Sequence, residues 1–304
     1  MKLLITGGTG IIGQEIINLS LIEGFNVNVL TRDKSLRSKR AGLKYFYWNP
    51  DAKVINHECF EGVNAVINLS GFNIINYWSK KNKLNILNSR VRSTEFILSE
   101  INKRNIKLKT FISASGIAAY KSSYSNFYTE NDSMSDKNSF LNQVVVKWES
   151  KVLEYKKEMP STSFSIMRIG IVLYREGGIY KISNNLGRFY LLSPIGDGKQ
   201  WQSWIHINDL ARAFIISSKE SWEGVYNLVS PNPVTQKVML ESIAKNINRK
   251  IIFPNIPVKL VSLLLGEVIE VINSSHKVDA QMLRLKGFRY NFSNLEQALT
   301  NLSS

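Results

Sequence analysis

The first thirty residues alternate between apolar runs and a turn rich in glycine. Lys2 to Thr6 is a short apolar run, and the segment after the turn carries apolar side chains at helical spacing, at Ile12, Ile16, Leu19 and Ile22. Asn26 to Leu30 alternates valine with asparagine, which is typical of a strand. The pattern predicts a strand, a glycine turn, a helix and a second strand.

The same alternation continues to about residue 170. Further strands are predicted over residues 44–48, 65–69, 110–114 and 164–169. Long segments with helical periodicity separate the later strands, over residues 83–104 and 140–158. Because strands that alternate with helices require right-handed crossovers, the chain is predicted to have an α/β fold with a doubly wound parallel sheet and helices on both faces.

Beyond residue 170 the rhythm changes. Gly177–Gly178 and Gly196–Gly198 interrupt segments that we expect to be irregular, followed by a helix over 209–218 and a strand over 224–228. Helices are predicted over residues 238–246, 258–272, 278–286 and 295–302. We therefore expect a first domain over residues 1–173 and a smaller, mostly helical C-terminal lobe over 174–304, with elements near 205–230 returning to the first domain.

The glycine turn has the spacing of a dinucleotide-binding loop, because residues 6–13 satisfy both Gly-x-Gly-x-x-Gly and Thr-Gly-x-x-Gly-x-x-Gly. Glycine permits the tight turn and a close approach of the backbone to a pyrophosphate, whose charge is met by free amides at the helix start. The position between the first strand and a helix predicts a Rossmann-type domain. The cofactor-binding candidates in this turn are Gly7, Thr9, Gly10, Ile11, Ile12 and Gly13.

The end of the second predicted strand bears on the choice of nicotinamide cofactor. An acidic residue there favours the ribose hydroxyls of NAD, whereas arginine accommodates the 2′-phosphate of NADP. This chain has Thr31 and Arg32, with Lys34 and Arg37 close by. We therefore predict NADP(H), with two alternatives left open: that the basic cluster is a solvated loop, and that Asp33 turns inward.

Composition and charge exclude several classes of protein and of binding site. The 304 residues are 44% hydrophobic, an ordinary globular composition, and the single cysteine, Cys59, excludes an intramolecular disulfide and a cysteine-based zinc cluster. With three histidines no metal site is predicted. The net charge of +15 is spread along the whole chain and accompanies no nucleic-acid module, so no nucleic-acid partner is expected. A basic, nucleic-acid-associated protein is kept as a third alternative.

No segment reads as a signal peptide or a membrane span. The apolar run at the start of the sequence stops at Thr6, too early for a signal peptide. The apolar stretch over 256–272 carries Lys259, Glu267 and Glu270 and is shorter than the roughly 20 apolar residues of a membrane helix. A cytoplasmic protein without a membrane partner is expected.

Longer strings along the chain carry a family resemblance. They are Asn68–Gly71, Trp78, Ser89–Thr94, Ile112–Ser115, Trp148–Glu149, Arg168–Leu173, Gly198–Asp209, Asn227–Leu228, Pro231–Val234 and Leu264–Glu267. Together with the glycine turn they resemble the extended, atypical short-chain dehydrogenase/reductases, namely the NAD-dependent epimerase/dehydratase family and its SulA-like, cell-division-inhibitor branch. The resemblance covers nearly the whole chain.

The resemblance implies a sheet that binds the dinucleotide and a small lobe that closes over a substrate cleft. It places a second group of residues beside the cofactor, at the ends of the fourth and fifth predicted strands: Leu69, Ser70, Gly71, Ser113 and Ala114.

The chain departs from the family at the catalytic pair. Relatives carry Tyr-x-x-x-Lys on the helix after the fifth strand, where the ammonium lowers the pKa of the phenol for proton exchange. The corresponding segment here has Gln143 and Lys147, so the lysine is expected to remain beside the cofactor and the tyrosine is lost. The Tyr77 to Lys81 match lies after the fourth strand and is read as coincidence.

Substitute acid or base residues are Ser115, Tyr120 and His206. His206 has the ordinary pKa of a proton shuttle, with a structural role as the alternative. Around these candidates Trp201 and Trp204 are predicted either to stack on a planar substrate or to pack in the core. Arg168 is predicted either to bind a substrate anion or to form an ion pair.

The sequence thus predicts an NADP(H)-binding epimerase or oxidoreductase that transfers hydride to or from a small polar substrate. The alternative is a catalytically silent, NADPH-binding regulatory protein that lacks the Tyr-x-x-x-Lys pair and reports to a protein partner.

Overall fold

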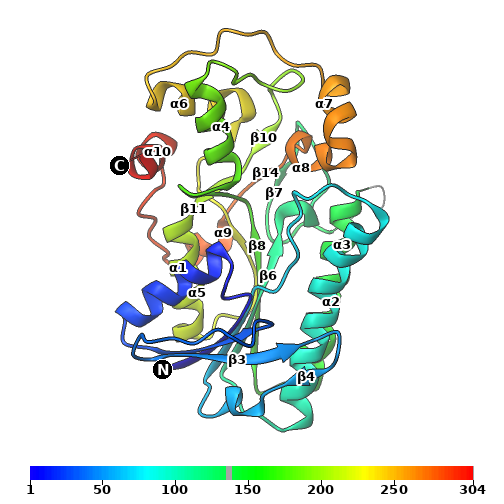
Figure 1. Ribbon diagram of the computed structural model, residues 1–304, viewed down its shortest axis with the longest axis vertical. Coiled ribbons are helices and arrows are strands. Elements are labelled where there is room, and N and C mark those ends of the chain that lie inside the picture. The colour runs from blue at the N-terminus through cyan, green and yellow to red at the C-terminus, as the bar shows by residue number, and fades with distance from the viewer. Residues whose placement is uncertain (135–138, 304) are drawn as a thin grey trace.

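The computed structural model describes residues 1–134 and 139–303, and an eight-stranded sheet forms its centre (Figure 1). In sequence order the strands of this sheet are β1 (Lys2–Thr6), β2 (Asn26–Thr31), β3 (Leu43–Asn49), β4 (Val54–Ile55), β5 (Ala65–Asn68), β6 (Thr110–Gly116), β8 (Ser163–Ile169) and β12 (Gly224–Leu228). Their spatial order is β12-β8-β6-β5-β1-β2-β3-β4. The order reverses at β1, which makes the sheet doubly wound.

The central strands pair in parallel, and β4 is antiparallel to β3 at one edge. Ile5 of β1 lies opposite Val29 of β2 on one side and Ile67 of β5 on the other. These side chains are fully buried, as expected for a parallel sheet that helices cover on both faces.

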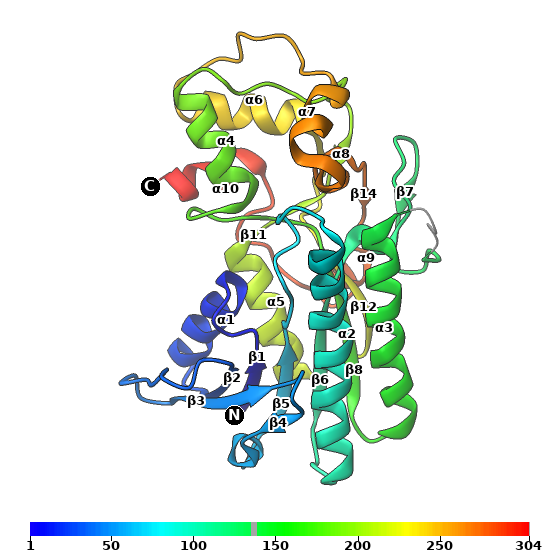
Figure 2. The same ribbon diagram turned by 45° about the vertical axis from the view of Figure 1, so that its right-hand side comes forward.

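Two pairs of helices cover the sheet (Figures 1 and 2). The first face carries α1 (Ile11–Ile22) and α5 (Ile207–Glu220), and the second carries α2 (Lys80–Lys103) and α3 (Phe140–Glu158). Ser79 and Ser139 cap α2 and α3, since each hydroxyl accepts a hydrogen bond from a first-turn amide. The two helical layers enclose separate apolar cores, one around Ile16 and Phe214 and one around Ile97.

A smaller lobe lies at the upper end of the molecule in Figure 1. Its helices are α4 (Gly178–Arg188), α6 (Gln236–Asn246), α7 (Val258–Leu265), α8 (Ile269–Asn273) and α10 (Leu295–Ser303), while α9 (Gln281–Leu285) lies against β12. Three small strand pairs connect the lobe to the sheet domain: β9 (Ile171–Leu173) with β11 (Trp204–His206), β10 (Trp201–Gln202) with β13 (Val234–Thr235), and β7 (Phe127–Tyr128) with β14 (Lys277–Val278). Single 3-10 turns lie at His57–Phe60, Ile117–Ala119 and Gly266–Val268.

The structure confirms the predicted α/β fold with its doubly wound sheet, and it corrects the lobe. The helix predicted over 258–272 is broken at Gly266, whose φ of +58° ends α7. Helix α4 occupies a segment that was predicted to be irregular. The prediction missed this helix because its buried positions are Tyr180, Ser183 and Gly187 rather than aliphatic residues. Helix α9 is shorter than the helix predicted over 278–286.

Candidate functional site

The glycine turn joins β1 to α1 through contacts that exclude side chains. Gly7 has a φ of +68°, and a Cβ there would lie 2.6 Å from the carbonyl oxygen of Leu69. A Cβ on Gly13 would lie 2.6 Å from the carbonyl oxygen of Gly7. The turn therefore packs directly against the end of β5 and against the first coil of α1, at two positions where only glycine fits.

The start of α1 carries no side-chain cap. Gly10 is the N-cap residue, and Gln14 turns back to donate a hydrogen bond to the carbonyl oxygen of Gly8 at 2.8 Å. Thr9 and Ile11 are exposed and Ile12 is half-buried, so the predicted residues lie at the mouth of the turn. Uncapped amides at a helix start attract an anion such as a pyrophosphate.

A buried hydrogen-bond network fixes the neighbouring ends of β1 and β5. The Thr6 hydroxyl donates to the Asn68 side chain at 2.7 Å, and the Asn68 amide donates to the Thr94 hydroxyl at 2.8 Å. Ser113 lies next to this network, within 3.5 Å of the Asn68 amide. The chain continues from β5 through Leu69, Ser70 and Gly71, at the same end of the sheet as the glycine turn. Ala114 follows Ser113 on β6. The predicted cofactor residues of these two strands thus lie close together.

Arg90 on α2 is a cofactor candidate that the sequence analysis did not single out. A Cβ on Gly71 would lie 3.0 Å from its guanidinium carbon, which stands 5.5 Å from the centroid of the Trp148 ring. The guanidinium donates to the carbonyl oxygens of Phe72 and Ile86, and burial lowers the pKa of Arg90 to about 10. No carboxylate among the described residues pairs with it. Arg90 lies within the string Ser89–Thr94, which pointed to the family resemblance but not to a role for this side chain.

The basic loop after β2 leaves Arg32 available. Thr31 is buried and its hydroxyl accepts a hydrogen bond from the Asp33 amide, whereas Arg32 is exposed and makes no ion pair with a described residue. Asp33 accepts two hydrogen bonds from Ser35, which lower the pKa of its carboxyl group. Asp33 is therefore engaged within its own loop.

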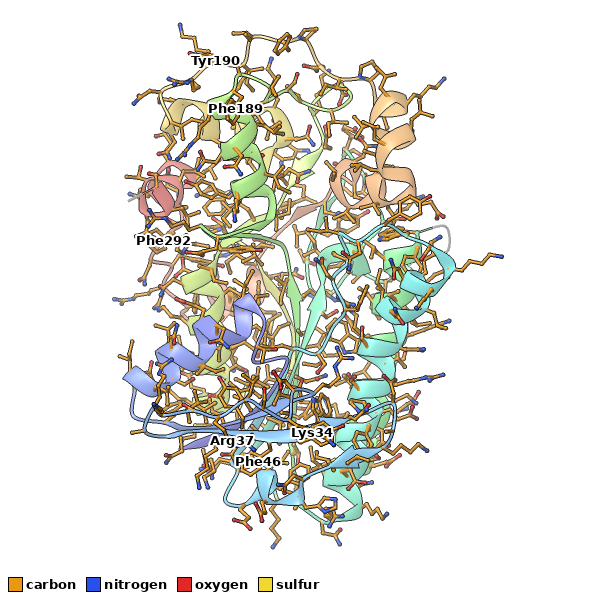
Figure 3. The ribbon with its side chains drawn as sticks, in the orientation of Figure 1. Lys34, Arg37, Phe46, Phe189, Tyr190 and Phe292 are labelled. Carbon is orange, nitrogen blue, oxygen red and sulfur yellow. The ribbon has the colours of Figure 1, made fainter. Side chains whose placement is uncertain are left out.

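Three other cations of this loop, Lys34, Arg37 and Arg40, contact groups of the protein, and Figure 3 labels the first two. Lys34 stands 4.6 Å from the centroid of the Tyr47 ring, and Arg37 donates to carbonyl oxygens of its own loop. Arg40 donates to the Asn18 side chain at 2.7 Å. Arg32 is thus the cation of the cluster that is best placed to meet a phosphate at the end of β2.

Two of the predicted catalytic residues join a buried ion-pair network. Ser115 donates to Glu149 at 2.5 Å, and Glu149 accepts two further hydrogen bonds from Arg168, at 2.9 and 3.0 Å. Arg168 also donates to the Tyr120 hydroxyl, which itself donates to Asn227 at 2.8 Å. Arg168 thus forms the ion pair that was one of its two predicted roles.

The network keeps its members in fixed protonation states. Burial opposes the charge on Arg168, but the hydrogen bonds and charge of Glu149 outweigh burial and raise the pKa of the guanidinium. Burial raises the pKa of Tyr120, so its phenol stays protonated at neutral pH. Ser115 and Tyr120 are therefore both engaged in hydrogen bonds rather than free to act as acid or base, and Tyr120 forms the part of this floor network that lines a cavity.

A cavity of about 470 Å³ opens above this floor, between the sheet domain and the lobe. Leu141, Ile171, Val271 and Trp201 contribute apolar surface to its lining, and the polar lining includes Gln202, Ser122, Glu270 and His276. The His276 Nε2 atom lies 3.1 Å from the carbonyl oxygen of Tyr120. His276 is the imidazole of this cavity, and the sequence analysis did not select it, because no motif surrounds it. Trp204 is buried in the core of the lobe instead.

The prediction for Lys147 is wrong because it rests on an incorrect helical register. Gln143 and Lys147 are exposed on α3, on the side opposite its buried residues, which include Trp148 and Glu149. One of the residues that face the sheet is Val145, whose side chain lies beside Gly116, and Leu141 lies one turn earlier in the cavity lining. These two aliphatic residues have the i, i+4 spacing of the family pair.

His206 does not line the cavity. It caps α5, where its Nδ1 atom accepts a hydrogen bond from the Asn208 amide at 3.2 Å, and its ring stacks on Phe292, which Figure 3 labels. Burial lowers the pKa of His206 to about 4, against opposing effects of Asp209 and Asn301. The structure therefore gives His206 the structural role that was left open, and we do not include it in the chemistry.

The buried imidazole of His206 makes stability depend on pH. A pKa near 4 in the fold, against an ordinary value of 6.5, corresponds to about 3 kcal/mol of unfolding free energy that is present above pH 6.5 and lost as the pH falls to 4. His206→Asn keeps a capping side chain and removes this titration. We expect urea unfolding at pH 6.5 and pH 4 to show a smaller loss in the variant, and equal losses would contradict this role.

Comparison with known proteins agrees with this architecture. The doubly wound sheet, the glycine turn at its first crossover and the lobe above it define an extended short-chain dehydrogenase/reductase of the epimerase type. The profile of the NAD dependent epimerase/dehydratase family matches residues 3–228, and the chain belongs to that family.

Relatives match over almost their full length. An epimerase family protein of Staphylococcus aureus (strain MRSA252) is 30% identical, and the match covers 99% of this chain and 98% of the relative. The crystal structure of the human epimerase family protein SDR39U1 (isoform 2) with NADPH has a TM-score of 0.87 and 27% identity over 100% of this chain and 99% of that one. Thermus thermophilus UDP-glucose 4-epimerase, solved with NAD, shares the fold with a TM-score of 0.77 and 16% identity, covering 100% of this chain and 98% of that one.

The described residues contain neither a membrane-spanning helix nor a group of metal-binding side chains. Over residues 1–134 and 139–303, no helix has the length and apolar character needed to cross a lipid bilayer. In the same part of the chain, no three His, Cys, Asp or Glu side chains are grouped so that they could hold a metal ion.

Proposed function

We propose that this protein is an NADP(H)-dependent oxidoreductase acting on a small, uncharged and partly apolar carbonyl compound or the matching alcohol. The observation that carries the proposal is the glycine turn at the uncapped start of α1. Arg32, which makes no ion pair with a described residue, lies near it at the end of β2, and a cavity lies between the sheet domain and the lobe. The match to the NADPH-bound human relative supports the same cofactor.

The residues present fit a phosphorylated dinucleotide. The α1 amides and the Gly7 to Gly13 backbone would hold the pyrophosphate, and Arg32 would meet the adenosine 2′-phosphate. Arg90 supplies a second guanidinium near Gly71, where its lack of a carboxylate partner among the described residues leaves its charge for an anion. When bound, the cofactor supplies reversible hydride transfer.

The cavity sets the class of substrate. Its aliphatic lining and the indole of Trp201 favour apolar surface, and Gln202 and Ser122 provide a few hydrogen-bonding groups. The carboxylate of Glu270, which also caps α3 through Ser139, disfavours a diphosphate at this wall. We therefore propose an uncharged substrate in place of a nucleotide sugar.

We assign the accompanying proton transfer to His276. The ring lines the cavity, whereas Ser115 and Tyr120 are engaged in the floor network. The Nε2 atom lies 3.1 Å from the Tyr120 carbonyl oxygen, and this contact holds the ring at the cavity wall. An imidazole ring can give a proton to the alkoxide formed in carbonyl reduction when the ring is protonated, and it can take the proton of the alcohol in the reverse reaction when it is neutral.

The test is a screen of NADPH oxidation with uncharged aldehydes and ketones beside UDP-glucose. We expect turnover of an uncharged carbonyl compound and none of UDP-glucose. The His276→Gln variant should lose about 10²- to 10⁴-fold in kcat while its affinity for NADPH stays unchanged. Turnover of UDP-glucose, or full activity of the variant, would contradict the proposal.

A second candidate function is a regulatory protein that binds NADPH without chemistry. The observation in its favour is that Leu141 and Val145, which have the i, i+4 spacing of the family pair on the inner side of α3, are aliphatic. This candidate predicts tight NADPH binding, no turnover in the same screen, and a protein partner whose affinity changes with NADPH. Under both candidate functions we propose that the protein acts in the cytoplasm.

A further inference from the structure

The upper end of the lobe exposes large apolar side chains from three separate segments. We call this surface the apical rim: residues 188–191 at the end of α4, the loop 249–256, and helix α7 (Figures 1 and 2). Phe189 is 75% exposed, Ile252 62%, Leu263 83% and Leu264 84%. Such exposure of leucine, isoleucine and phenylalanine side chains at one end of a lobe marks an interaction surface.

The first two segments of the apical rim are held together by direct contacts. The Arg249 guanidinium stands 5.2 Å from the centroid of the Tyr190 ring. The Ser193 hydroxyl donates to the carbonyl oxygen of Pro254 at 2.6 Å. Figure 3 labels Phe189 and Tyr190 at this end of the lobe. The apolar side chains of these two segments therefore belong to one ordered surface.

Helix α7 exposes an apolar face. Its sequence is Val-Lys-Leu-Val-Ser-Leu-Leu-Leu, and none of its eight residues is buried. Leu260, Leu263 and Leu264 have i, i+3 and i+4 spacing, so they share one side of the helix. All three are more than half exposed.

The apical rim is also positively charged. Arg188, Arg249, Lys250 and Lys259 are exposed on its three segments, and none of the four forms an ion pair with a described residue. Exposed apolar and aromatic side chains flanked by lysine and arginine are typical of proteins that lie on a membrane surface.

We propose that the apical rim binds the surface of a membrane that contains anionic phospholipid. Leu263, Leu264 and Phe189 would enter the interface, and the four cations would meet the headgroups. A second copy of this chain fits less well, because it would bring the same cations together on a chain of net charge +15. The glycine turn lies in the sheet domain, so the surface does not overlap the cofactor site (Figure 1).

The experiment is co-sedimentation of the full chain with phosphatidylcholine vesicles, with and without phosphatidylglycerol. We expect binding to the vesicles that contain phosphatidylglycerol, and weaker binding as salt increases. The double variant Leu263→Glu, Leu264→Glu should bind at least about tenfold more weakly. Lys250→Gln with Lys259→Gln should reduce affinity roughly 25-fold, about fivefold for each cation.

Two single-substitution controls make the same kinds of change, an apolar residue to glutamate and a lysine to glutamine, elsewhere on the surface. Ile22→Glu places a charge at an isoleucine that is 79% exposed on α1, and Lys107→Gln removes an exposed cation after α2. Both should bind vesicles like the unmodified chain, and circular dichroism checks that every variant is folded.

Three results would overturn the proposal. One is that the protein sediments equally with vesicles that contain phosphatidylglycerol and vesicles that lack it, or that the rim variants sediment as much as the unmodified chain. Another is a dimer, detected by light scattering, that the leucine double variant dissociates while no vesicle binding occurs. The third is binding to polyglutamate but not to vesicles, which would identify an acidic protein as the partner.

Discussion

Replacing Arg168 with leucine is expected to lower the free energy of unfolding by about 3 to 5 kcal/mol. The substitution leaves Glu149 buried at 2% exposure with its partner removed, and it deprives the Tyr120 hydroxyl of a donor. An unpaired carboxylate in the interior costs far more than the pair contributes, because water no longer solvates it. Urea denaturation at neutral pH measures the loss.

The double variant Arg168→Leu, Glu149→Leu is the matched control. It removes both charges, and we expect it to recover much of the stability that the single variant loses. It also leaves the glycine turn untouched, so NADPH binding by the folded fraction should remain. A single variant that loses less than about 1 kcal/mol would show that the charge on Glu149 is relieved in another way.

Replacing Arg32 with alanine is expected to weaken NADPH binding roughly 10- to 150-fold and to leave NADH binding unchanged. The estimate is the about 1.5 to 3 kcal/mol of a hydrogen bond to a charged group, converted to an affinity. The selectivity follows because only NADP carries the adenosine 2′-phosphate that Arg32 would meet. Calorimetric titration with each cofactor measures both affinities.

Arg40→Ala is the control for charge alone. It removes a guanidinium from the same loop, but one that is held by Asn18. We expect a change of less than about threefold for either cofactor, because an exposed charge at this range is screened by salt. Equal losses in the two variants would show that the loop attracts anions only through its net charge.

The fold could be predicted because its signals are local. A parallel sheet buries both faces, so its strands are short apolar runs such as Leu3 to Ile5, and the glycine turn lies between the first of them and a helix. The lobe was less predictable, since α4 packs through Tyr180, Ser183 and Gly187 and its pattern is not apolar. Helix α7 was predicted for its apolar residues, none of which the structure buries.

The site depends on contacts between distant residues, which limits prediction from sequence. Glu149 and Arg168 come from a helix and a strand, and no spacing rule connects them. The position of Lys147 was misjudged because a four-residue spacing fits two registers of α3, and only packing against the sheet selects Leu141 and Val145. His276 became a candidate only when the fold placed it in the cavity.

The central claim is that the glycine turn and Arg32 form an NADP(H) site. Calorimetric titration of the unmodified protein with NADPH and, separately, NADH tests it most directly. The account predicts one NADPH site per chain with at least about tenfold preference over NADH. No heat with either cofactor, or equal affinity for both, would contradict it.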